Sequence, residues 1–151
     1  MITTRTANSI LNAMTGRTQN ISIASRAFIA LSSTEPNKLG QGVTEPVGGG
    51  YERKQIGYYN DTYGQLMGAP DDGVITNTQE IHFNEATGDW GEQKYVCIFD
   101  AATGGNLVAW GELGEFEGGD ATSGTWKAKS ITPQANTVVV LKVGMVRISI
   151  K

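Results

Sequence analysis

The sequence has very little cysteine and histidine, and each shortage excludes a class of chemistry. Cys97 is the single cysteine, so no intrachain disulfide can form and no cysteine cluster can hold a metal. This usage is typical of a chain made in a reducing cytoplasm. His82 is the single histidine, so no second imidazole can help it to bind a metal or to polarise a nucleophile.

Strong charge and long apolar runs are also missing. Twelve basic and fifteen acidic residues give a formal net charge of -3, with no run of lysine or arginine. Without that electrostatic footprint we expect no nucleic acid partner. The longest apolar run, residues 138–146, is interrupted by Lys142, and the amino terminus lacks a basic start followed by an apolar stretch. We therefore expect neither a secretion signal nor a membrane partner.

Glycine and apolar residues are plentiful by comparison. The 151 residues include 20 glycines against 4 prolines, and 39% of them are hydrophobic. This balance is typical of a β protein with many turns, and the length suits one domain with one core.

Near the amino terminus, apolar residues recur at the helical spacing i, i+3, i+4 and i+7, namely at Ala7, Ile10, Leu11 and Met14. The spacing predicts a helix over residues 4–15, capped by Thr3 or Thr4 and ended by Gly16. An isolated helix of about a dozen residues is marginal in water, so its apolar face must dock on its own domain or on a neighbouring subunit. We therefore expect a helical arm, residues 1–20, followed by a β-sandwich domain, residues 21–151.

Short apolar segments bounded by turn residues predict strands in the rest of the chain, at residues 21–23, 27–31, 51–59 and 81–83. Between them, residues 32–50 and 61–73 are rich in turn formers and predict surface loops.

The clearest hairpin is expected at residues 95–110, with residues 100–105 as its turn. The runs 138–143 and 145–150, on either side of Gly144, predict a second hairpin at the carboxyl end. Many short strands without βαβ alternation favour an all-β fold, an antiparallel β-sandwich or jelly roll with a short N-terminal helix.

No residue is predicted to be catalytic, to bind a cofactor or to bind a metal. The Asp71-Asp72-Gly73 triplet lacks the spacing and closing glutamate of a calcium loop, and the Gly48–Gly50 run lacks the lysine ending of a phosphate loop. Strand alternation places His82 at the surface, and Cys97 lies in an apolar segment that predicts a core position.

One stretch has features of a binding surface. Tyr58, Tyr59 and Tyr63 lie beside Asn60 and Asp61, a mixture that suits both protein interfaces and sugar platforms. The alternative is that these tyrosines complete the core. Together with the apolar face of the helix they form the predicted partner interface: Ala7, Ile10, Leu11, Met14, Tyr58, Tyr59 and Tyr63.

Four segments in order carry a recognisable pattern: ALSSTEP at residues 30–36, VTEPVGGGYER at 43–53, ATGDWG at 86–91 and IFDAATGGNL at 98–107. The chain resembles, from about Phe28 to its carboxyl end, a family of small tailed-bacteriophage virion proteins labelled tail fibre, minor tail or capsid decoration protein. The resemblance implies a structural, non-enzymatic protein that is synthesised in the host bacterial cytoplasm and located in the virion. The tyrosine-rich residues 58–73 depart from the pattern, so no binding residue is transferred to them.

Two roles within the virion remain. A receptor-binding fibre usually carries an elongated stalk, visible as heptads or long repeats, and neither is present. This favours a capsid decoration (cement) protein that bridges capsid subunits. The alternative is a tail or head fibre or minor tail protein that takes part in host-receptor contact. In either case we expect the partners to be other copies of the chain, as a homotrimer, and the major capsid protein or other virion proteins.

Overall fold

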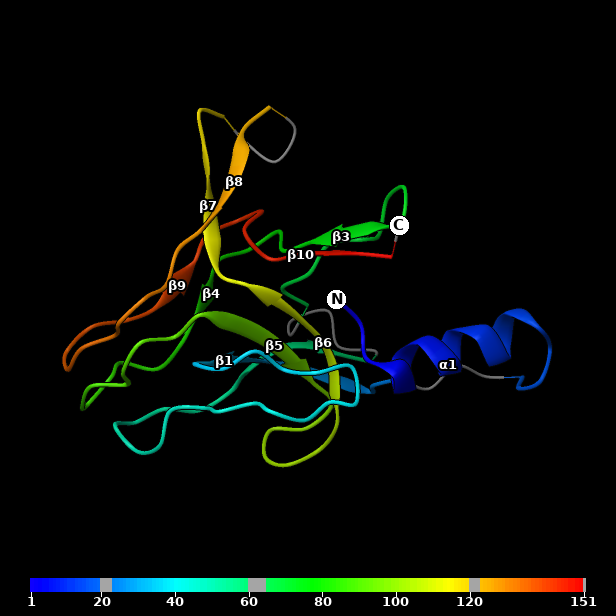
Figure 1. The fold of residues 1–151 in the computed structure, drawn as a ribbon, viewed down its shortest axis with the longest axis horizontal. Helices are drawn as coiled ribbons and strands as arrows, with labels where there is room; N and C mark the ends of the chain where they lie inside the picture. Colours follow the sequence, from blue (N-terminus) through cyan, green and yellow to red (C-terminus); the bar gives the residue numbers. More distant parts are fainter. Residues whose placement is uncertain (20–22, 60–64, 120–122, 151) are drawn as a thin grey trace.

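The computed structural model describes residues 1–19, 23–59, 65–119 and 123–150. Across these ranges it contains one helix and ten strands, and Figure 1 shows their arrangement. In chain order they are α1 (Thr4–Met14), β1 (Arg26–Ser32), β2 (Lys54–Tyr58), β3 (Val74–Thr76), β4 (Ile81–His82), β5 (Tyr95–Phe99), β6 (Leu107–Glu112), β7 (Gly114–Glu117), β8 (Thr125–Ala128), β9 (Val140–Leu141) and β10 (Arg147–Ser149). The predicted all-β fold with a short N-terminal helix is confirmed.

The main sheet has four strands in the order β2-β1-β5-β6. Three two-stranded ladders accompany it: β10 with β3, β4 with β9, and β7 with β8. Every one of these strand pairs is antiparallel. The β5–β6 hairpin forms over the residues predicted for it, with Phe99 opposite Leu107 across the turn.

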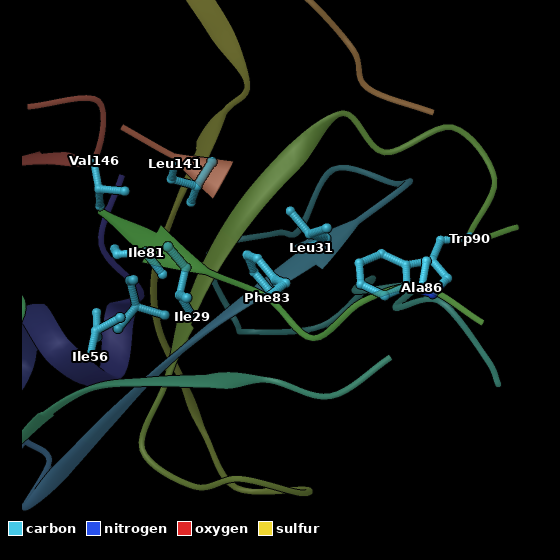
Figure 2. Close-up of a cluster of buried hydrophobic side chains, with 10 residues drawn as sticks. Ile29, Leu31, Ile56, Ile81, Phe83, Ala86, Trp90, Leu141 and Val146 are labelled. Carbon is cyan, nitrogen blue, oxygen red and sulfur yellow. The ribbon is translucent and has the colours of Figure 1, made fainter. Parts of the chain in front are cut away.

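The core lies between one face of the main sheet and the ladders packed on it (Figure 2). Ile29 and Leu31 of β1 meet Ile81 of β4, and the same cluster contains Leu141 of β9 and Val146. Alternation along the strands sends the next residues to the opposite face, where Ala30, Cys97, Phe99, Leu107 and Trp110 form a smaller cluster. The main sheet and the ladders packed on it are two layers, consistent with the sandwich alternative of the prediction.

Residues 1–3 extend the main sheet beyond β6. The backbone N–H of Trp110 donates to the Met1 carbonyl at 2.8 Å, and the Thr3 N–H donates to the Val108 carbonyl at 3.0 Å. Helix α1 begins directly after this added segment. Its first turn is therefore attached to the domain, while Figure 1 shows the rest of the helix extending away from the sheet.

Two expectations about strands need correction. The runs at the carboxyl end do not form a hairpin with each other, because β9 pairs with β4 and β10 pairs with β3. Segments distant in the sequence supply the matching edges, and strand periodicity cannot identify such partners. The strand expected at residues 21–23 falls mostly outside the described residues, and Ile23 itself lies at a bend.

Within the described ranges, no helix has the length and apolar character needed to cross a membrane.

Candidate functional site

The apolar face of α1 is covered at its start and uncovered at its end. The Thr3 side chain caps the helix as predicted, accepting from the Thr6 N–H at 3.3 Å, and the Thr6 hydroxyl donates to the Val108 carbonyl at 3.0 Å. Further along, Ala7 and Ile10 are half-buried. Leu11 is 56% exposed and Met14 is 76% exposed. Two large apolar side chains at the outer end of the helix are thus in contact with solvent.

The predicted tyrosine surface is only partly described. Tyr58, at the end of β2, lies under the guanidinium of Arg26, which is 4.6 Å from the ring centroid. Tyr59 is 74% exposed, which does not fit the alternative of a core position. Tyr63 lies outside the described residues. Among the strands of the described chain, α1 contacts β6, whereas Tyr58 lies on β2 at the other edge of the main sheet, so we treat the helix and the tyrosines as two surfaces.

His82 and Cys97 lie where the sequence predicted them. His82 is exposed on β4, with its Nε2 atom 2.9 Å from a carboxylate oxygen of Glu80. Cys97 is fully buried in β5, and burial raises the pKa of its thiol to about 12. A buried thiol with a raised pKa is a poor nucleophile.

The acidic triplet and the glycine run both have structural explanations. Asp71 and Val74 exchange two backbone hydrogen bonds around Asp72 and Gly73, whose positive φ values of 45° and 73° are those of a tight hairpin turn. Gly49 also has positive φ, and a Cβ atom there would lie 3.0 Å from the Trp90 ring. No group of three or more potential metal-ligating side chains occurs in the described part of the chain.

A partly buried ion pair was not predicted from the sequence. The guanidinium of Arg53, only 8% exposed, makes a forked contact with the Glu45 carboxylate, the shortest distance being 2.6 Å. It also donates to the carbonyls of Ala101 and Gly104 at 2.8 Å and lies 3.5 Å from the Phe99 ring centroid. Tyr51 donates to Glu45 at 2.8 Å, and burial raises the pKa of its hydroxyl.

This network connects the long loop after β1 to the turn of the β5–β6 hairpin. The guanidinium contacts Glu45 in the loop and the carbonyls of Ala101 and Gly104 in the turn, so the network supports the fold where these two segments meet. The sequence gives little indication of this ion pair, because the residues around Glu45 and Arg53 are ordinary loop residues. Only the fold brings the two side chains to the hairpin turn.

The sequence also did not predict the β7–β8 hairpin. Its two aromatic residues, Phe116 and Trp126, pack edge to face with centroids 5.1 Å apart. With Met145 and Ile148 they line an apolar cavity of about 250 Å³ between the hairpin and the main sheet. Trp126 remains 42% exposed. The alternation of polar and aromatic residues in Glu-Phe-Glu and in Thr-Trp-Lys could have indicated these two strands. The signal is weak because the stretch has few other apolar residues.

Comparison with known proteins gives one family. Residues 1–132 match the model of a family described as podophage GP4 fiber I protein gp80. No curated protein matches the chain. The matched span begins with α1 and includes the whole main sheet and the β7–β8 hairpin. The resemblance to phage virion proteins is thereby supported at the level of a fibre family. Because the match covers most of the sequence, the chain belongs to the podophage GP4 fiber I protein gp80 family.

Proposed function

We propose that this chain is a non-enzymatic structural subunit of a phage fibre that takes part in contact with the host receptor. The observation that carries the proposal is the family match over residues 1–132, which includes every element from α1 to β8. His82 lies at the surface beside Glu80, and Cys97 is buried with a raised thiol pKa, positions that suit a structural role.

The family match favours the fibre role over the capsid decoration role. The absence of a stalk in the sequence favours decoration, but a compact subunit can form the base or the tip of a fibre while other chains supply its length. A match to a fibre family is the more direct observation. Capsid decoration is therefore the competing role, and finding the protein on the capsid shell would support it.

Within this proposal, the outer end of α1 is the segment that docks on another virion protein. The helix is attached at its start by Thr3 and Thr6, so its direction is set by the domain. Leu11 and Met14 are exposed at its far end. Fully burying such side chains contributes about 1.5–3 kcal/mol each, so their burial would favour docking of the helix on a partner surface. The domain division at residue 20 stays a proposal too, with the qualification that residues 1–3 pair with β6.

Self-association into a homotrimer is also part of the proposal. Most soluble assemblies of identical chains are closed and symmetric, and a fibre is built from repeated contacts between copies. The exposed Tyr59 and the uncovered Trp126 offer apolar surface for contacts with copies or with the receptor.

Imaging of intact particles carrying a labelled chain tests the role directly. We expect the label on a fibre and not on the capsid shell. A label distributed over the shell would overturn the fibre role and support decoration.

A second experiment tests the docking segment. Leu11→Ser with Met14→Ser should leave a folded chain that is lost from purified particles, whereas Asn8→Ser with Gln19→Ser, which changes exposed polar residues, should be retained. These substitutions are cleaner than deletion of residues 1–16, because deletion would also remove the segment that pairs with β6. Full retention of the Leu11 and Met14 variant would show that α1 is not the docking segment.

A further inference from the structure

The β7–β8 hairpin has no strand neighbours of its own. Figure 1 shows it rising away from the main sheet, and each of its strands pairs only with the other among the described residues. Each strand therefore has one edge without a strand partner in that part of the chain. A two-stranded hairpin by itself is at best marginally stable in water, and open strand edges tend to pair with another chain.

One face of the hairpin is apolar and the other is charged. Residues opposite each other in an antiparallel pair point to the same side, which places Phe116 with its cross-strand partner Trp126. The glutamates and lysines alternate with these aromatic residues and point to the other side. The aromatic face packs incompletely on the domain, since it lines the cavity of about 250 Å³ and leaves Trp126 42% exposed.

The two edges of the hairpin carry opposite charge. Strand β7 contributes Glu115 and Glu117, whereas Lys127 and Lys129 lie on and directly after β8. Within the hairpin, Lys127 lies 2.5 Å from Glu117 and Lys129 lies 2.8 Å from Glu115. These pairs are about half exposed, so each contributes little and each charge can also act on a neighbouring chain.

We propose that the hairpin is the contact between copies of this chain, with the β7 edge of one copy pairing antiparallel with the β8 edge of the next. This head-to-tail order brings acidic side chains against basic ones, whereas pairing of β7 with β7, or of β8 with β8, would bring like charges together. The proposal rests on the self-association included in the proposed function and assigns a surface to it.

The same contact has a geometric consequence. A head-to-tail interface closes into a ring when its rotation permits, and a closed ring leaves no free strand edge. In the proposed homotrimer, three copies would contribute six strands to such a ring. The neighbouring strand would also extend the apolar face and cover the exposed part of Trp126.

Two variants with the same charge change test the contact in the full-length chain. The first is Glu115→Lys with Glu117→Lys, on the proposed edge, and the second is Glu35→Lys with Glu85→Lys, at exposed positions elsewhere. Masses are measured by light scattering over a range of concentrations, and circular dichroism confirms that both variants are folded. We expect the first variant to associate at least about tenfold more weakly than wild type, and the control to match wild type.

A charge-swapped chain separates contacts between copies from contacts inside the hairpin. The variant Glu115→Lys, Glu117→Lys, Lys127→Glu, Lys129→Glu restores opposite charge in both places. It should self-associate like wild type but form no mixed oligomers with it, because every mixed interface places like charges together. Native mass spectrometry of the mixture, with one chain isotopically labelled, measures this exclusion.

Each outcome decides the proposal. Free mixing of swapped and wild-type chains, or unchanged association of the β7 variant, would overturn the hairpin contact and leave the fibre role standing. A wild-type chain that stays monomeric at every concentration would overturn both the contact and the self-association in the proposed function. The position of the label on particles is independent of these results.

Discussion

The main sheet and the β7–β8 hairpin are both antiparallel, but they are stabilised by different interactions. In the main sheet the strands are covered on both faces, and β1 has five consecutive buried residues from Phe28 to Ser32. In the hairpin, all four residues of β8 are exposed, and its visible support is one aromatic pair and two surface ion pairs. Burial therefore stabilises the sheet within one chain, whereas burial within the chain contributes little to the hairpin, and in the proposed contact a neighbouring chain would supply it.

The sharpest test of this comparison replaces one tryptophan of the core packed against the main sheet and one tryptophan of the hairpin. Trp90→Ala removes a buried ring whose Nε1 donates to the Gly49 carbonyl at 2.7 Å, and should lower the free energy of unfolding by about 3–5 kcal/mol. Trp126→Ala removes a partly exposed ring in contact with Phe116 and should cost about 1 kcal/mol in the monomer. Denaturant titration measures both, and equal losses would contradict the difference between the regions.

A smaller loss is expected when the loop network beside the sheet is broken. Arg53→Met would leave the Glu45 carboxylate without its forked partner and should lower the free energy of unfolding by about 2–3 kcal/mol. Lys54→Met is the matched control, because Lys54 is the exposed neighbour on β2 and its loss should cost less than about 0.5 kcal/mol. If the two variants unfold at the same denaturant concentration, the network does not stabilise the fold.

The turn of the β5–β6 hairpin should show a pH effect. Burial opposes ionisation of Asp100, but the backbone and side-chain N–H groups of Asn106 donate to its carboxylate at 2.6 and 2.8 Å and hold its pKa below the ordinary value of 3.8. A carboxyl whose pKa is lowered on folding contributes stability above its unfolded pKa and loses it as pH falls through the folded pKa. Asp100→Asn should therefore be about 1 kcal/mol less stable at pH 7, with the difference shrinking as pH falls below the ordinary pKa of 3.8 and through the lower folded pKa. A pH-independent difference would assign the loss to another cause.

The smallest effect is expected at His82, on the ladder that covers the core. His82 is exposed, and its ring contacts the carboxylate of Glu80, which is exposed too. His82→Ala should change the free energy of unfolding by less than about 0.5 kcal/mol and leave particle infectivity unchanged. Loss of infectivity by a variant that folds normally would show that this surface has a function.

The helix and the β5–β6 hairpin could be predicted from the sequence because both depend on neighbours along the chain. The cap at Thr3 and the turn at residues 100–105 lie within a few residues of the elements that they define. The same locality explains the expected position of Cys97, whose flanking apolar residues identify a buried strand. The exposed end of α1 was consistent with the sequence, but only the structure shows that its start is attached to β6.

By itself, the sequence determined the all-β class, the amino-terminal helix, the central hairpin and the phage virion resemblance, because periodicity, turn residues and motifs act over short distances. The tertiary structure decided which strands pair across long separations, as for β9 with β4 and β10 with β3. It also decided that Arg53 donates to the Gly104 carbonyl, in the turn of a hairpin some fifty residues away. In the same way, only the structure shows that β7 and β8 rise from the sheet with one acidic and one basic edge. The physical reason is that such contacts depend on the closure of long loops and on which apolar faces are still uncovered after the local elements have formed.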